Sequence, residues 1–371
     1  MIRSESVLFL LSRVLGGKTF SSHLMRVVET MTHIQPHFVF LEEEDYGRYR
    51  QKIPSWNRLS GLFVGPSILR WKLRRDPPPA SDKVFVQSFE LIPALQEVDP
   101  LAPAILAHDS TNVLSYRLIR DTSPGPGAKL LCGLKSLLVT PNYKSVIGRA
   151  RAFLPRTHWC ARSLVTDFGV EPERIIVAPS GIDTQLWSPD WSRVRGEPPI
   201  LLWVGNDFAR KGGEFLLEVF TRFLFPRARL RIVSNDPAIK GRAWPAGVEH
   251  LHGLGHGNPA EIVDAYRSAD IFVFPTRKEH MGMVLTEACA TGLPIVATDV
   301  GGVREAVREG KNGILLPYGA GAEEWASAIL DLLADPVKRE RFGVYSRAIA
   351  ENEFSFGVLR ERVKAAFAKL A

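Results

Sequence analysis

The segment from Pro275 to Gly302 constrains this chain most, because it joins a loop, a helix and a strand around two carboxylates. Glu279 lies in the predicted loop. Glu287 lies eight positions later, on the first turns of a helix that begins near Gly282. The apolar run Pro294–Thr298 then predicts a buried strand. An alternation of short strands and helices is typical of an α/β protein with a parallel, doubly wound sheet.

The start of that helix predicts a phosphate site. Backbone N–H groups in the first turn of a helix have no partner within the helix, and they attract phosphate. Here they belong to Gly282, Met283 and Val284. A carboxylate about one turn further along, Glu287, suits the hydroxyl groups of a ribose, as acidic residues do at other nucleotide sites. The segment therefore predicts binding of a nucleoside diphosphate through its phosphates and its sugar.

This segment resembles the glutamate-x7-glutamate signature of retaining glycosyltransferases, in particular glycosyltransferase family 4, the glycogen-synthase- and mannosyltransferase-like group 1 with the GT-B fold. The chain departs from the family pattern at His280, where a small residue is usual, and at Met281, where an aromatic residue is usual. His280 adds a titratable group beside Glu279, and it either touches the donor substrate or points to solvent. The matching residues are Pro275, Glu279, Gly282, Glu287, Ala288, Ala290, Gly292, Pro294, Ala297, Gly301 and Gly302.

Two cations precede another predicted helix in the second half of the chain. The apolar strand Leu201–Val204 ends in Gly205, and Arg210 and Lys211 follow in the strand-to-helix turn. Fixed cations beside a helix start suit a diphosphate. The family resemblance implies that Lys211 holds the donor pyrophosphate. Asn206 stands where the family has an arginine, so we expect Arg210 to supply the missing charge and regard Lys211 as the stronger candidate.

The first half of the chain carries three weaker features. Gly16-Gly17, after the first predicted strand, resembles the family's glycine-rich loop, although a plain turn is the alternative. His108 follows the predicted strand Ala104–Ala107, and the resemblance implies contact with the donor sugar at the reaction centre, whereas a lone histidine is more often structural. The segment Ala178–Asp183, with Ser180 in place of the usual asparagine, resembles the segment that closes the first domain and indicates architecture rather than chemistry.

The length of 371 residues favours two domains over one. The segment Ser188–Pro199, rich in proline and charge, predicts a linker. We expect an acceptor-binding Rossmann-like domain over residues 1–190 and a donor-binding Rossmann-like domain over residues 196–338. The GT-B resemblance implies that these two doubly wound domains face each other across a cleft. It also implies that the helices of residues 339–371 cross back to the first domain.

Short apolar runs predict parallel strands in both halves. The sequence also predicts a helix over Tyr143–Phe153. The strands expected in the first half are Val7–Leu11, His37–Leu41, Lys83–Gln87, Ala104–Ala107, Leu137–Thr140, Thr157–Cys160 and Ile175–Val177. Those expected in the second half are Ile200–Gly205, Arg229–Ser234, His250–Gly253, Asp270–Phe274, Pro294–Thr298 and Gly313–Leu316.

The formal net charge of +7 suits anionic ligands or an anionic surface. Between Gly47 and Arg75 basic residues alternate with aromatic and aliphatic ones, and no acidic residue occurs. This pattern is typical of helices that lie on anionic lipid, so it predicts a membrane contact. The alternative is a helix pair with a solvated basic rim. Nucleic acid is not expected, because the chain has no helix-turn-helix, zinc-finger or RNP-like motif.

Cysteine usage and hydropathy bear on the compartment. Cys132, Cys160 and Cys289 are far apart, which predicts free thiols in a reducing compartment. No apolar run approaches the roughly 18 residues of a membrane span. The run Val7–Leu11 is better explained by a buried strand than by a signal peptide. We therefore expect a cytoplasmic protein, peripheral on the inner face of the cell membrane if the basic segment contacts lipid.

By resemblance, the chain is expected to be a retaining hexosyltransferase in polysaccharide biosynthesis. It would move a hexose from a UDP-, GDP- or other nucleoside diphosphate sugar to a glycan or lipid-linked acceptor. Lys211, Arg210 and the helix start at Gly282 would stabilise the leaving diphosphate, so neither a metal ion nor another cofactor is expected. Glu279 and His108 would line the reaction centre.

Three histidines raise the question of a metal site, and two other functions are alternatives to the transferase. His250, His252 and His256 suggest a metal site by composition, but the first two flank a predicted strand, so no metal is expected. One alternative function is a nucleotide-sugar epimerase of the same fold. The other is a degenerate GT-B subunit that associates with a membrane.

Overall fold

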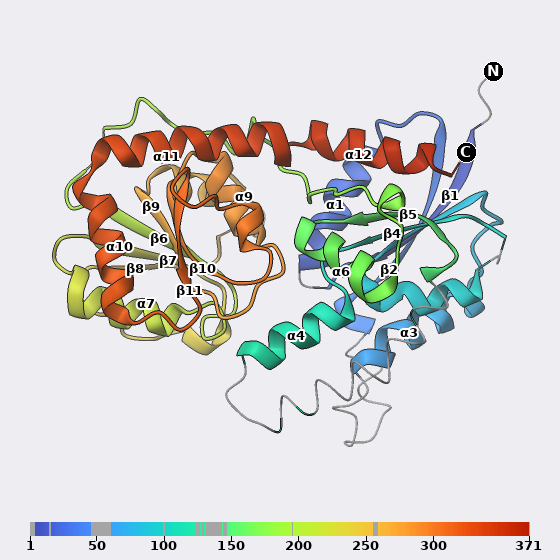
Figure 1. Cartoon of the computed structure of the whole chain (residues 1–371), viewed down its shortest axis with the longest axis horizontal. Coiled ribbons are helices and arrows are strands. Elements are labelled where there is room, and N and C mark those ends of the chain that lie inside the picture. Colours follow the sequence, from blue (N-terminus) through green and yellow to red (C-terminus); the bar gives the residue numbers. More distant parts are fainter. Residues whose placement is uncertain are drawn as a thin grey trace. The chain divides into compact units, whose positions relative to one another are not determined.

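The computed structural model describes residues 4–14, 16–45, 61–98, 101–122, 147–194, 196–254 and 259–370, together with Gly127, Leu130 and Tyr143. The chain divides into two compact units (Figure 1). Met1–Gly181 and Phe356–Ala371 form the first unit, and Ile182–Ser355 forms the second. Helix α11 (Pro336–Ile349) stays with the second unit, and α12 (Phe356–Ala368) belongs to the first. The sequence-based boundary placed all of residues 339–371 in the returning segment.

The first unit is built on a five-stranded parallel sheet with the strand order β2-β1-β3-β4-β5. The order reverses beside β1, because β2 lies on one side of it and β3 on the other. The strands are β1 (Glu5–Ser12), β2 (Ile34–Leu41), β3 (Lys83–Gln87), β4 (Ala104–His108) and β5 (Ala150–Pro155). The α-helices are α1 (Gly16–Val28), α3 (Gly61–Arg75), α4 (Asn112–Thr122), α6 (His158–Phe168) and α12.

Both faces of this sheet are covered by apolar side chains. Phe9 of β1 points to the face that α1 and α12 cover, and its ring lies 6.4 Å from the Phe367 ring. Leu8 and Leu10 of the same strand point to the opposite face, among residues of α3. Since successive side chains of a strand alternate between faces, a strand buried on both sides is a continuous apolar run. This is why β1 was recognisable in the sequence.

The structure differs from the sequence prediction around β5. The sequence predicts a helix over Tyr143–Phe153, whereas Ala150–Pro155 forms a strand that is buried apart from Arg151. The predicted strand Thr157–Cys160 is also wrong, because Thr157 is the N-cap of α6 and its hydroxyl accepts a hydrogen bond from the Cys160 N–H at 3.0 Å. A capping hydroxyl satisfies an otherwise unpaired helix amide, and this local bond outweighs a short apolar run. The predicted strand Leu137–Thr140 lies outside the described residues.

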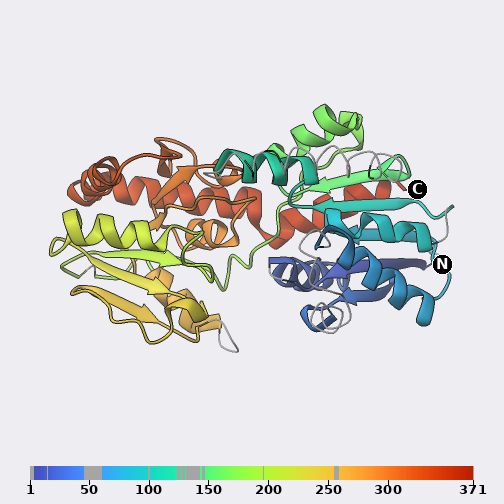
Figure 2. The same ribbon diagram turned by 90° about the horizontal axis from the view of Figure 1, so that it is seen from below.

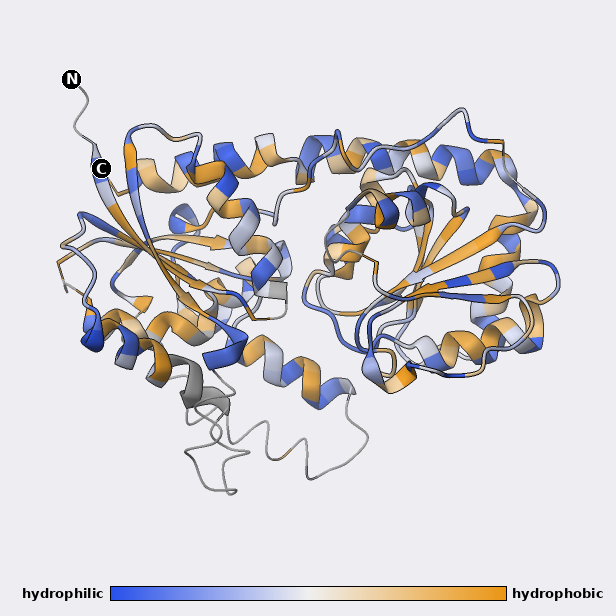
Figure 3. Ribbon diagram, turned by 180° about the vertical axis from the view of Figure 1, so that it is seen from behind, coloured by the Kyte–Doolittle hydropathy of each residue, from blue (hydrophilic) through white to orange (hydrophobic). Residues whose placement is uncertain are grey.

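The second unit contains a six-stranded parallel sheet with the order β11-β10-β9-β6-β7-β8. Helices cover both of its faces, and Figure 3 shows hydrophobic residues along its strands. The strands are β6 (Ile200–Val204), β7 (Arg229–Val233), β8 (Val248–Leu251), β9 (Ile271–Phe274), β10 (Ile295–Asp299) and β11 (Gly313–Pro317). The α-helices are α7 (Gly213–Val219), α8 (Pro259–Arg267), α9 (Met283–Ala290), α10 (Ala322–Ala334) and α11.

The strand order of the second sheet reverses between β6 and β9. From β6 the chain continues to β7 on one side, and from β9 it continues to β10 on the other side. Figure 2 shows the helices that connect these strands on the two faces of the sheet. In open α/β sheets, ligands bind beyond the carboxyl ends of the strands at such a reversal. The loops that follow β6 and β9 are therefore the first place to look for a site.

These two loops are packed so closely that one position between them must be glycine. Gly212 has a φ of +77°, in the left-handed region. A Cβ at this position would lie 2.0 Å from the carbonyl oxygen of Pro275, in the loop after β9. The Arg277 N–H also donates to the Arg210 carbonyl at 2.9 Å, which fixes one loop against the other.

We expect Gly212→Ala to lower the free energy of unfolding by about 3 kcal/mol, because left-handed strain and a backbone overlap act together. Urea unfolding followed by circular dichroism measures the loss. Gly310→Ala is the matched control: Gly310 has a φ of +71° and no atom within 4 Å of its added Cβ. It should cost only about 1 kcal/mol of strain. Equal losses in the two variants would contradict the packing argument.

Candidate functional site

Two cations and a carboxylate meet where β6 and β9 end. Lys211 follows β6, and its Nζ lies 3.9 Å from Oε2 of Glu279, which follows β9. Arg210 Nη1 lies 3.9 Å from the same oxygen. All three side chains are mostly buried or half-buried. The structure thus brings the adjacent predicted site residues Arg210 and Lys211 to Glu279, which lies about 70 positions later in the sequence.

Lys211 is held in place by its surroundings. Gly205 leaves room for its aliphatic chain, since a Cβ there would lie 2.5 Å from the Lys211 Cδ. The Trp203 indole N–H donates to the Lys211 carbonyl at 3.1 Å, and the Lys211 Nζ lies 5.3 Å from the centre of the Phe274 ring. Burial lowers the pKa of Lys211, and the nearby Glu279 opposes this shift. The ammonium group therefore acts in a partly desolvated place, where its field is stronger than in water.

Arg210 is already engaged by the protein. Its Nε donates to Oδ2 of Asp207 at 2.6 Å, and its Nη1 donates to the Lys278 carbonyl at 2.7 Å. These bonds tie the loop after β6 to the loop after β9 and offset part of the arginine's charge. The geometry therefore gives Arg210 a positioning task and leaves Lys211 as the stronger candidate for a phosphate ligand.

Helix α9 begins without a side-chain cap. Its N-cap is Gly282, with a φ of +75°, and the Leu285 N–H donates to the Gly282 carbonyl at 2.9 Å. A side chain at Gly282 would crowd Glu279, whose Cγ would lie 3.2 Å from the added Cβ. The amides of Met283 and Val284 open the helix directly after this glycine. These amides are hydrogen-bond donors at the positive end of the helix dipole, and this combination suits an anion.

Glu287 of α9 is paired with a residue that the sequence analysis missed. The hydroxyl of Tyr266 on α8 donates to Oε2 of Glu287 at 2.7 Å. The Tyr266 ring is fully buried, stacked at 5.7 Å on Phe272 and edge-on to Trp187 at 5.3 Å. Burial raises the pKa of Glu287, and the Tyr266 hydrogen bond and the Lys211 charge oppose the rise. In the sequence Tyr266 is an ordinary apolar position of a helix, so only the fold reveals it.

The remaining predicted site residues lie in the first unit. His108 ends β4 and is buried, and its ring lies edge-on to Phe89 at 5.4 Å. Burial lowers the pKa of His108 to about 4, so the ring is neutral near pH 7. Gly16 and Gly17 begin α1. A Cβ at Gly17 would lie 2.6 Å from the Ser12 carbonyl, so this glycine lets the helix start directly over the end of β1.

The histidines that suggested a metal site bond to the backbone. His250 Nε2 and His252 Nδ1 lie 3.1 Å and 3.2 Å from the same Ser234 carbonyl oxygen. His256 is outside the described residues. Within the described part of the chain, no group of three or more histidine, cysteine, aspartate or glutamate side chains is arranged to hold a metal ion.

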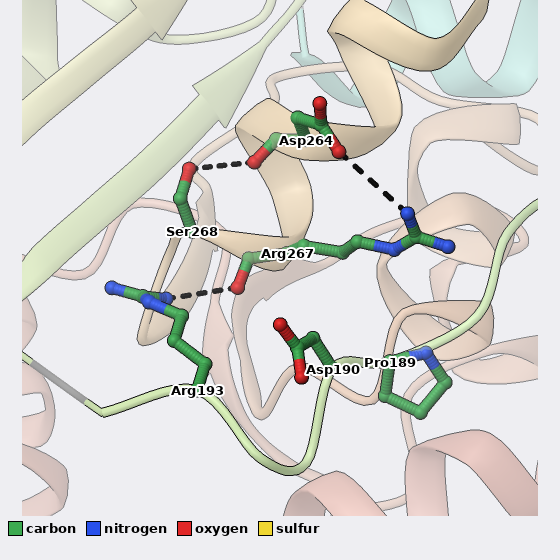
Figure 4. A pocket seen from close by; sticks show the side chains of 6 residues that line it. All are labelled: Pro189, Asp190, Arg193, Asp264, Arg267 and Ser268. Carbon is green, nitrogen blue, oxygen red and sulfur yellow. Dashed lines mark hydrogen bonds and ion pairs between the residues drawn. The ribbon is translucent and has the colours of Figure 1, made fainter.

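A second-unit pocket is lined by none of the predicted site residues, and the hydrogen bonds around it have a structural role (Figure 4). Arg267 Nε donates to the Ser188 carbonyl at 2.7 Å, and Arg193 Nη1 donates to the Arg267 carbonyl at 2.8 Å. These bonds fasten the segment before β6 to α8. The pocket is lined by Pro189, Asp190, Arg193, Asp264, Arg267 and Ser268.

The part of the predicted basic segment that the structure describes is helix α3, while residues 47–60 lie outside the described residues. Three of its cations are paired. Lys72 donates to Asp45 and to the Phe40 carbonyl. Arg74 donates to both carboxylate oxygens of Glu97 at 2.7 and 2.9 Å, and Arg70 Nε lies 3.8 Å from Oε1 of Glu97. Trp71 is 55% exposed and lies under the Arg75 guanidinium. None of the described helices has the length and hydropathy to cross a bilayer.

Comparison with known proteins finds a family model that matches part of the chain. Residues 189–349 match the family described as glycosyl transferases group 1. The D-inositol 3-phosphate glycosyltransferase of Kribbella flavida is 29% identical over 272 residues, which cover 67% of this chain and 61% of that protein. This chain spans between 50% and 63% of the length of the curated relatives that it matches.

Two solved structures resemble the whole chain. Sucrose-phosphate synthase from Thermosynechococcus elongatus aligns with a TM-score of 0.75 and 15% identity over 99% of both chains. Anabaena HepE, solved with UDP-glucose, aligns with a TM-score of 0.66 and 15% identity over 98% of this chain and 99% of that one. At such low identity these likenesses show the fold. The partial family match agrees with the resemblance seen in the sequence, and the chain has the GT-B fold that this resemblance implied.

Proposed function

We propose that this protein is a retaining glycosyltransferase that moves a hexose from a nucleoside diphosphate sugar to a glycan or lipid-linked acceptor. The observation that carries the proposal is the grouping of Lys211, Glu279 and the open start of α9 at the strand-order reversal. A donor of this class has a diphosphate, a ribose and a sugar. The second unit offers a cation with helix amides, a hydrogen-bonded carboxylate and a second carboxylate.

In this proposal the donor's diphosphate binds to Lys211 and to the amides of Met283 and Val284. When the sugar–oxygen bond breaks, negative charge grows on the diphosphate, and these fixed groups stabilise it without a metal ion. Arg210 keeps the two loops in register. Because the protein supplies the positive charge, neither a metal nor another cofactor is required.

In this proposal the two carboxylates bind different parts of the donor substrate. Glu287 accepts hydrogen bonds from the ribose through the oxygen that Tyr266 leaves open. Oε2 of Glu279 is buried and accepts no hydrogen bond within the described residues. A sugar hydroxyl would satisfy it, so we assign Glu279 to the transferred hexose. We assign His108, as a neutral ring, to a hydrogen bond with a substrate hydroxyl.

The alternatives are less favoured. A degenerate subunit would not need a paired lysine and carboxylate beside an uncapped helix, yet Lys211, Glu279 and Glu287 are all in place. An epimerase reaction proceeds without an acceptor, so analysis of the products formed in the absence of acceptor distinguishes it from a transferase. The anomeric configuration of the product, measured by NMR, tests retention.

Isothermal titration calorimetry with UDP, GDP, ADP and dTDP should show tight binding of one nucleotide, and EDTA should not change it. Lys211→Met should weaken that binding at least about tenfold, since hydrogen bonds to charged groups contribute about 1.5–3 kcal/mol. Lys240→Met, at an exposed lysine of the same unit, is the matched control and should bind normally. If the folded protein binds no nucleotide, the result favours the degenerate-subunit alternative over the transferase. Loss of binding in EDTA would contradict metal independence.

The affinity for the nucleotide should depend on pH through Glu287. Because burial raises its pKa above that of an ordinary glutamate, the carboxyl becomes ionised only as the pH rises through this higher value. Ribose hydroxyls donate best to the ionised form, so binding should weaken from neutral to mildly acidic pH. Tyr266→Phe removes a hydrogen bond that favours ionisation, and it should move the midpoint to higher pH. Calorimetry across the pH range checks both; an unmoved midpoint in the variant contradicts the Tyr266 assignment.

We further propose that the protein is cytoplasmic and that α3 contacts an anionic membrane surface through Trp71 and Arg75. Lys72 and Arg74 are unsuitable for this contact, because they are engaged by Asp45 and Glu97. An exposed tryptophan under an arginine supplies both an interfacial ring and a positive charge.

Replacing both residues, Trp71→Ser with Arg75→Ser, should reduce co-sedimentation with phosphatidylglycerol vesicles at least about threefold, as one charge near the surface contributes about 1 kcal/mol. Vesicles of phosphatidylcholine alone should retain little protein. Leu101→Ser with Arg151→Ser is the control, because these residues are exposed elsewhere in the same unit. Undiminished sedimentation of the Trp71 and Arg75 variant would refute the membrane contact.

A further inference from the structure

Three buried polar side chains follow the carboxyl ends of β4 and β5 in the first unit, and each has a polar atom without a hydrogen-bond partner within the described residues. These atoms are both ring nitrogens of His108, Nε of Arg156 and Oγ of Ser180. The three residues are 1%, 8% and 1% exposed. Arg156 packs on Phe20, on the face of the sheet that α1 covers, whereas the His108 ring packs on Phe89, on the opposite face. Buried polar groups without partners are rare in folded proteins, so a group of them calls for an explanation.

The backbone explains why these residues are neighbours. His108 ends β4, and its carbonyl accepts a hydrogen bond from the N–H of Arg156, which directly follows β5, at 3.0 Å. Beyond β5, the Ala178 N–H donates to the Pro155 carbonyl at 2.9 Å, which carries the chain along β5 to Ser180. Adjacent strands of a parallel sheet therefore deliver all three residues to one edge, where α/β proteins bind their ligands.

Arg156 is the unusual member of this group. Its guanidinium lies 4.2 Å from the centre of the Phe20 ring, and no carboxylate lies within ion-pair distance among the described residues. An arginine keeps its charge in proteins, and burial of a charge without a partner destabilises the fold. Burial does lower the pKa of Arg156, with Asp109 opposing the shift from a distance. A cation in this situation is better explained by a ligand than by the stability of the fold.

The chemistry of the group defines that ligand. Arg156 offers a planar fork of N–H donors, which matches the two oxygens of a phosphate or carboxylate. Ser180 offers a hydroxyl donor. His23 already contacts the Ser180 carbonyl at 3.1 Å, which holds that residue in place. Arg156 and Ser180 thus supply donors and one positive charge. Asp109 acts on that charge only from a distance, and no described acidic side chain lies within ion-pair distance of Arg156, so the groups call for an anion.

We propose that Arg156 and Ser180 bind a phosphate or carboxylate group carried by the acceptor substrate. This rests on the proposed function, in which Lys211 and α9 of the second unit hold the diphosphate of the donor. An acceptor that bears this anion would be selected over a neutral glycan of the same size. The acceptor is therefore a sugar phosphate, a lipid-linked phosphate or an acidic sugar.

Inorganic phosphate, titrated in the absence of any nucleotide and with sodium chloride matched in ionic strength, is the probe. We expect phosphate to raise the melting temperature of the wild-type protein more than sodium chloride does. Arg156→Met should abolish this response and raise the melting temperature without ligand, since it removes an unpaired buried charge. Arg151→Met, at an exposed arginine of β5, should leave both quantities unchanged. Ser180→Ala, a smaller change, should weaken the phosphate response severalfold with the fold intact.

Three results would overturn the proposal. One is a wild-type protein that responds to phosphate no more than to sodium chloride. Another is an Arg156→Met protein that melts at lower temperature yet still responds to phosphate, which would make the arginine structural. The third is at least tenfold weaker binding of the nucleoside diphosphate by Arg156→Met, which would assign the anion to the donor. Normal nucleotide binding with a lost phosphate response supports the acceptor assignment, and it remains interpretable if the calorimetric test of the donor site fails.

Discussion

The reversal of strand order between β6 and β9 is the constraint on which the candidate site depends. It turns the chain in opposite directions after two neighbouring strands, so the loops that follow them meet at one edge of the sheet. Gly212 allows the two loops to touch, because a side chain there would overlap the Pro275 carbonyl. Lys211 and Glu279 then lie within 4 Å of each other. Without this contact the cation and the carboxylate would belong to separate, solvated loops.

The charges at this edge are arranged to bind rather than to stabilise. Lys211 is partly desolvated, Glu287 has a raised pKa, and Oε2 of Glu279 accepts no hydrogen bond within the described residues. Each of these features costs the folded protein some stability, and each is offset when a ligand of opposite or complementary character arrives. Tyr266 and Arg210 act differently, since their hydrogen bonds fix the groups that would contact the donor. Groups that would bind the ligand can therefore be distinguished from groups that support them, because the protein itself already satisfies the hydrogen bonds and charges of the supporting groups.

The same test applied to the first unit singles out Arg156. Many arginines of this chain donate hydrogen bonds to carboxylates or carbonyls, as Arg74 does to Glu97 and Arg267 does to Ser188. Arg156 is buried against Phe20 without such a bond among the described residues. Among the described residues, each unit thus has a buried cation available to a ligand at the carboxyl edge of its parallel sheet, Lys211 in the second unit and Arg156 in the first. This division matches a transferase that binds two anionic substrates, a nucleoside diphosphate sugar at Lys211 and an acceptor with a phosphate or carboxylate group at Arg156.

The sequence by itself determined the fold class and most of the second unit. Strands buried on both faces are continuous apolar runs, and Glu279, Glu287 and Lys211 stand in motifs whose glycines and prolines are fixed by local backbone geometry. It failed at β5 and at the first turn of α6. At α6 the capping bond of Thr157 competes with a short apolar run that favours a strand. Only the tertiary structure could reveal Tyr266, Arg156 and the pairing of Lys72 and Arg74. A side chain's partner depends on residues far away in the chain, and whether a charge is satisfied or left for a ligand is decided only when the strands are side by side.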